Sequence, residues 1–97
     1  MFEEAKAELQ RLLAKDPANI DAAHQLALIQ GFEGDIEGSI EALIKLTLQA
    51  PDHLEIRYDL AMAQMMLGKF DEARANLRHI LAIEPTHEKA LQQLAYC

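Results

Sequence analysis

The chain has 97 residues, enough for one small domain. Sixteen acidic residues against nine basic ones give a formal net charge of -7, which argues against nucleic-acid binding through phosphates. No basic leader precedes an apolar run, and no apolar stretch reaches the roughly 18 residues of a membrane span, so we expect a cytoplasmic protein without membrane insertion. Valine is absent and aromatic residues make up 5%, which favours an all-α fold over a sheet.

Three prolines divide the chain at regular intervals. Pro17, Pro51 and Pro85 are the only prolines, and they are spaced 34 residues apart both times. Proline lacks the backbone N–H and its ring clashes with the preceding turn, so each proline is expected to follow the end of a helix. A period of this size is typical of helical repeat proteins.

The apolar residues between the prolines recur at three- and four-residue steps, as they do on one face of a helix. In chain order this pattern predicts six helices, over residues 2–15, 20–33, 36–50, 54–67, 70–84 and 87–96. Gly34 and Gly68 separate the two helices of each unit, because glycine accepts the left-handed backbone that ends a helix. Asn19 and Thr86 are the expected N-caps of the helices that follow them.

The repeated unit resembles the tetratricopeptide repeat (TPR), whose units consist of a helix A and a helix B. The best match is Leu-Gly-Lys-Phe-Asp-Glu-Ala at 67–73, followed by Ile-Leu-Ala-Ile-Glu-Pro at 80–85. The resemblance implies an α-α superhelix, a solenoid of six antiparallel helices in the order B-AB-AB-A. It divides one domain, 1–97, into a half repeat 1–19, full repeats 20–53 and 54–87, and a half repeat 88–97.

The sequence contains no motif of an enzyme or of a metal site. Cys97 is the only cysteine, and His24, His53, His79 and His87 form neither an HxxxH nor an HExxH pattern. Glycine-rich phosphate-binding motifs and the GxSxG nucleophile motif are also missing. We therefore expect no catalytic residue, no cofactor and no metal. His53 and His87 occupy equivalent turn positions, which favours local bonding within each turn.

What remains is a binding surface. The TPR resemblance implies a concave face built mainly by the A helices, where an apolar strip with acidic neighbours would suit an amphipathic, partly basic helix or an extended peptide. The candidate peptide-binding residues at the matching positions are His24, Leu28, Phe32, Glu55, Tyr58, Asp59, Met62, Met66, Gln92 and Tyr96. Family members that hold a terminal carboxylate use Lys, Asn and Arg on this face, and that set is not present at the matching positions.

The principal interpretation is therefore a protein–protein interaction scaffold that binds a peptide or helix of a partner protein. Two alternatives stay open. The first predicted helix is a B helix and the last is an A helix, so two chains could associate head to tail through them and form a homo-oligomer. The chain could also be a regulatory or docking fragment of a larger enzyme or complex subunit.

Overall fold

The computed structural model describes residues 1–97 and contains six α-helices and no strand, so the predicted all-α class is confirmed. The helices are α1 (Glu3–Lys15), α2 (Ile20–Phe32), α3 (Ile36–Gln49), α4 (Leu54–Met66), α5 (Phe70–Ile83) and α6 (Glu88–Tyr96). Every helix end lies within one residue of its predicted position or coincides with it. None of the six helices has the length and apolar character that crossing a membrane requires.

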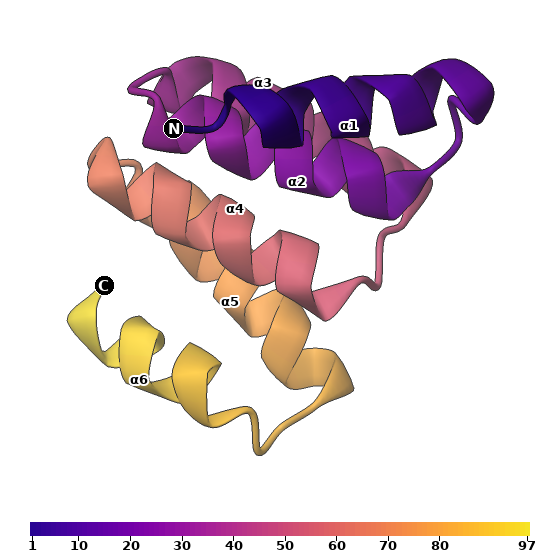
Figure 1. Cartoon of the computed structure of the whole chain (residues 1–97). Coiled ribbons are helices and arrows are strands. Elements are labelled where there is room, and N and C mark those ends of the chain that lie inside the picture. The colour runs from indigo at the N-terminus through magenta and orange to yellow at the C-terminus, as the bar shows by residue number, and fades with distance from the viewer.

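The helices form an α-α superhelix in which each one packs against the next in the chain (Figure 1). The pairs α2–α3 and α4–α5 make the most extensive contacts, and α2 also touches α4. The stack is elongated, with principal extents of 38, 25 and 19 Å. The A helices α2, α4 and α6 lie nearer the viewer than α3 and α5 in Figure 1, so they follow one another along one side of the stack.

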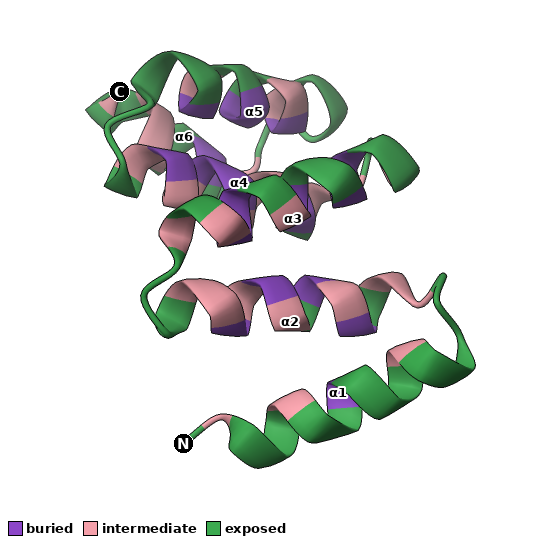
Figure 2. Cartoon of the chain, turned by 90° about the horizontal axis from the view of Figure 1, so that it is seen from above, coloured by how far each residue is buried: buried purple, intermediate pink, exposed green.

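The core is concentrated in the four central helices (Figure 2). Leu43 and Leu77, which are 34 residues apart, are both completely buried between a B helix and its neighbours. By contrast, Leu9 is the only buried residue of α1 and Ala90 the only buried residue of α6. The terminal helices therefore contribute one face each to the core and expose the other.

Small residues bring the helices of each repeat close together. The Ser39 hydroxyl donates a hydrogen bond to the carbonyl oxygen of Ala27 at 2.7 Å, which joins α3 to α2. In the second repeat Ala61 and Ala73 occupy the corresponding positions and are completely buried. A larger side chain at these positions would force the paired helices apart.

Side chains cap four of the helices. Asn19 accepts a hydrogen bond from the amide of Ala22 at 3.0 Å, as predicted. The prediction for Thr86 is wrong, because the N-cap of α6 is the next residue, His87, whose Nδ1 accepts from the Ala90 amide at 3.0 Å. His53 caps α4 in the same way. The expected local bonding of these two histidines is thus confirmed, since a neutral imidazole nitrogen is an acceptor.

Candidate functional site

An apolar groove with a volume of about 190 Å³ lies among α2, α3 and α4. The residues that line it are Leu28, Gly31, Phe32, Ile36, Ser39, Leu43, Asp59, Met62, Ala63 and Met66. Half of the predicted peptide-binding residues belong to this set. The structure therefore brings together side chains from two repeats that the sequence placed on one face.

Helical spacing explains how the apolar groove arises. Leu28 and Phe32 are four residues apart on α2, and Met62 and Met66 are four residues apart on α4, so each pair projects from one helix face. Phe32 and Met66 are 72% and 70% exposed. The ring of Phe2 stacks on Phe32 with 5.9 Å between ring centroids, so the N-terminus packs against the C-terminal end of α2. Clustered exposed apolar side chains of this kind mark interaction surfaces.

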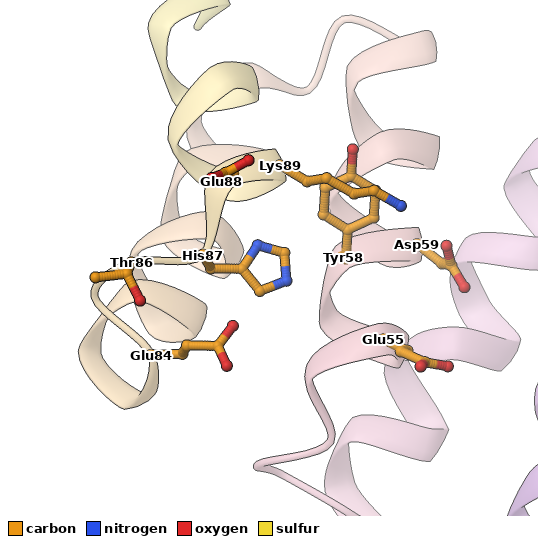
Figure 3. A pocket seen from close by; sticks show the side chains of 8 residues that line it. All are labelled: Glu55, Tyr58, Asp59, Glu84, Thr86, His87, Glu88 and Lys89. Carbon is orange, nitrogen blue, oxygen red and sulfur yellow. The ribbon is translucent and has the colours of Figure 1, made fainter.

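A second groove, of about 570 Å³, lies between α4 and the turn that joins α5 to α6 (Figure 3). Its lining residues are Glu55, Tyr58, Asp59, Glu84, Thr86, His87, Glu88 and Lys89. The lining contains four carboxylates and a single ammonium group, so we call this the acidic groove. The ring of His87 is directed towards Tyr58, and their centroids are 6.0 Å apart.

Asp59 lines both grooves and so joins them. The Nε2–H of His24 donates to Asp59 Oδ2 at 2.7 Å, because a carboxylate can only accept. His24 is 7% exposed, and the ring of His53 meets it edge-on at 5.7 Å. His24 thus lines neither groove. It is buried beneath them and orients the carboxylate of Asp59 through this hydrogen bond.

The other predicted site residues separate into two groups. Glu55 and Tyr58 line the acidic groove. Glu55 precedes Asp59 by one turn of α4, and Tyr58 is the residue directly before Asp59. Gln92 and Tyr96 are exposed on α6 and line neither groove. Sequence reasoning did not include Glu84 or Glu88, which flank the α5–α6 turn and carry half of the groove's carboxylates. In the sequence, Glu84 and Glu88 could be noticed only as acidic residues on either side of Pro85.

Two groups with shifted pKa values lie at helix ends outside both grooves. Hydrogen bonds from the backbone amide of Gly38 and then from the side chain of Gln30 lower the pKa of Asp35, the N-cap of α3. A hydrogen bond to Glu33, 3.0 Å long, raises the pKa of Lys6 and joins α1 to the end of α2. These shifts are accounted for by the packing of helix ends.

Antiparallel helix pairs stacked one upon the next define a helical-repeat protein. A sequence model of the tetratricopeptide repeat matches residues 32–95, well over half of the chain. The chain therefore belongs to the TPR family, as the resemblance predicted. No curated protein matches it.

Several solved structures superpose on nearly the whole chain. MamA AMB-1 is 28% identical with a TM-score of 0.81, over 97% of this chain and 51% of that one. Another MamA crystal structure is 24% identical with a TM-score of 0.82, over 96% and 54%. A tetratricopeptide repeat protein from Parabacteroides merdae is 22% identical with a TM-score of 0.84, over 93% and 36%. The chain thus spans about half the length of these MamA structures.

Proposed function

We propose that this chain is a TPR module that binds a segment of a partner protein along α2 and α4, and that it acts by binding and not by catalysis. The observation that carries the proposal is the apolar groove, where Leu28, Phe32, Met62 and Met66 from two repeats form one surface. Methionine side chains are flexible and polarisable, so they adapt to differently shaped apolar partners. The ligand in this proposal is a peptide or a helix.

Charge supports an amphipathic, partly basic partner. The acidic groove adjoins the apolar groove at Asp59, and the chain as a whole carries a formal charge of -7. A segment with basic residues would be attracted by this field, and its apolar residues would bury surface in the groove.

The proposal is tested by mass-spectrometric comparison of proteins captured by the immobilised chain and by two matched variants. Met66→Glu places a charge in the apolar groove at a side chain that is 70% exposed, whereas Leu48→Glu places the same charge on α3 at a side chain that is 78% exposed and lines neither groove. We expect partners to be lost with Met66→Glu and retained with Leu48→Glu. Partners retained by both variants would place binding elsewhere on the molecule.

A second candidate function is head-to-tail self-association through α1 and α6. Leu12 on α1 is 45% exposed, whereas Ile80, two repeats further on, is completely buried. Ala95 on α6 is exposed, whereas Ala61, one repeat earlier, is completely buried by α5. A B helix from a second copy would cover α6 as α5 covers α4, and would bury its own exposed face at the same time.

Sedimentation velocity over a wide concentration range tests this second candidate. We expect the wild-type chain to self-associate and Leu12→Glu to remain monomeric, while Leu48→Glu associates like the wild type. A wild-type chain that stays monomeric at the highest concentration would eliminate self-association and leave the partner-binding function unaffected.

A further inference from the structure

We infer that the partner segment is bipartite: it places an apolar side chain in the apolar groove and a lysine or arginine side chain in the acidic groove. This inference rests on the proposed function and specifies its ligand. It assigns a binding role to the α5–α6 turn, which lies outside the surface that the repeat pattern predicts. It also states how the ligand lies along α4, with its cationic end near Glu55 and its apolar end near Met66.

One face of α4 changes from charged to apolar along its length. Glu55, Asp59, Met62 and Met66 are spaced by three or four residues and therefore share that face. The first two carry charge and border the acidic groove, and the last two are apolar and border the apolar groove. From Glu55 to Met66 the helix rises by about 16 Å. A ligand that lies along this face must therefore change from cationic to apolar over that distance.

Asp59 makes the two grooves one continuous surface, because it is part of both linings. Its carboxylate is held by His24, which is buried, and its side chain is still 30% exposed. The Oδ2 atom accepts from His24 at 2.7 Å, which still leaves the carboxylate able to accept hydrogen bonds from a ligand. A cation that enters here meets a carboxylate whose position is already fixed.

The acidic groove has the chemistry of a site for a cationic side chain. Glu55 supplies a carboxylate from α4 and Glu84 one from the α5–α6 turn, and the rings of Tyr58 and His87 lie close to each other in the same groove (Figure 3). A cation beside an aromatic face gains further electrostatic attraction. Lys89 is the one ammonium group in the lining, and it opposes the entry of a second cation. Its removal should therefore strengthen binding.

The length of the surface sets the length of the probe. An extended peptide advances about 3.3 Å per residue, so about five residues cover the 16 Å face of α4. The synthetic hexapeptide LLAARR, with blocked ends, fits this requirement. The peptides LLAAQQ and LLAAEE keep the apolar end and change only the charge. The three peptides separate the contribution of the acidic groove from that of the apolar groove.

Binding of each peptide to the intact chain is measured by NMR titration. We expect LLAARR to bind at least about tenfold more tightly than LLAAEE, with LLAAQQ between them, and the difference to shrink in 1 M salt, where charges are screened beyond about 3 Å. A spin label on the arginine end should broaden the signals of Tyr58 and His87. A label on the leucine end should broaden the methyl signals of Met62 and Met66.

Protein variants provide the second measurement. Lys89→Gln should tighten the binding of LLAARR several-fold, and Glu55→Gln should weaken it several-fold. Glu37→Gln is the matched control, because Glu37 is the second residue of α3 as Glu55 is of α4, and it lines neither groove. Glu37→Gln should bind LLAARR like the wild type.

The outcomes distinguish this inference from the proposed function. If all three peptides bind in the apolar groove with equal affinity, or if LLAAEE binds most tightly, the bipartite ligand is wrong and the proposed function stands. Broadening at the opposite ends would also overturn the inference. If none of the peptides binds up to about 5 mM, the bipartite ligand is wrong, and the capture experiment decides the proposed function independently.

Discussion

The side-chain amide of Asn76 donates a hydrogen bond to Gln64 Oε1 at 2.9 Å, between α5 and α4, and both residues are buried. Arg57 completes the network, since its Nη1 donates to Asn76 Oδ1 at 3.0 Å and its Nε donates to the carbonyl oxygen of Pro51 at 2.9 Å. Every buried side-chain nitrogen and oxygen atom of the chain has a partner. Polar groups thus link the two helices of the second repeat.

Removal of Asn76 should destabilise the fold. In Asn76→Ala the Gln64 amide stays buried without its donor, and an unsatisfied buried polar group costs about 1–3 kcal/mol. Chemical denaturation measures the free energy of unfolding. Arg78→Ala, an exposed position on the same helix, is the control and should change stability by less than about 0.5 kcal/mol. Equal stability of the two variants would show that the network contributes nothing.

The first repeat lacks this network and has an open groove in its place. Ala23, Gln30 and Ala42 occupy the positions 34 residues before Arg57, Gln64 and Asn76. All three line a groove of about 400 Å³ between α2 and α3. The small alanine side chains leave the space that arginine and asparagine fill in the second repeat.

If the same network is introduced into the first repeat by two substitutions, their effects on stability should therefore be cooperative. We expect Ala23→Arg with Ala42→Asn to be more stable than the sum of the single variants predicts, by about 1 kcal/mol, because each new side chain supplies the other's hydrogen-bond partner. A double-mutant cycle by chemical denaturation measures this coupling. Ala23→Lys with Ala42→Asn is the control, since lysine lacks the forked guanidinium. Additive effects in the arginine pair would refute the transfer.

The two turn glycines should differ in their tolerance of substitution. Gly34 and Gly68 have φ angles of 105° and 75°, and an added Cβ would contact no atom within 4 Å at either position. The cost is therefore conformational, about 1–2 kcal/mol for alanine. Asparagine populates the left-handed region near a φ of about 57°, which is closer to Gly68. Thermal unfolding should show Gly68→Asn to be more stable than Gly34→Asn; the reverse order would contradict this explanation.

The helices could be predicted from the sequence because local chemistry determines them. Pro17, Pro51 and Pro85 follow helix ends through their own backbone constraints, and Gly34 and Gly68 supply the positive φ angles that the turns between paired helices require. The face of each helix follows from its apolar spacing. The apolar groove could be anticipated for the same reason, since it is made of residues at matching repeat positions.

The acidic groove could not be anticipated, because it depends on how the α5–α6 turn is placed against α4. Glu84 and Glu88 line the same groove as Glu55 only through that placement. The bond between His24 and Asp59 joins residues 35 positions apart, which requires α2 and α4 to be adjacent. The N-cap of α6 is His87 and not Thr86 because Asn19, His53 and His87 are spaced by 34 residues and cap their helices at the same repeat position. An imidazole nitrogen can accept the capping hydrogen bond as a side-chain oxygen does.

The N-cap of α3 should make the stability depend on pH. The pKa of Asp35 is lowered by hydrogen bonds from Gly38 and Gln30, so the folded state binds a proton at this carboxylate less readily than the unfolded state does. The stabilisation by Asp35 is complete above its unfolded pKa, about 3.9, and is lost as the pH falls through the lower folded value. Urea denaturation at pH 6 and pH 2.5 should show that Asp35→Ala is destabilised relative to the wild type at pH 6 and less destabilised at pH 2.5. Asn19→Ala is the matched control, because Asn19 caps α2 through the same bond and does not ionise. It should cost about 1 kcal/mol at both pH values, and an Asp35→Ala effect that is equally independent of pH would contradict the electrostatic origin of the cap.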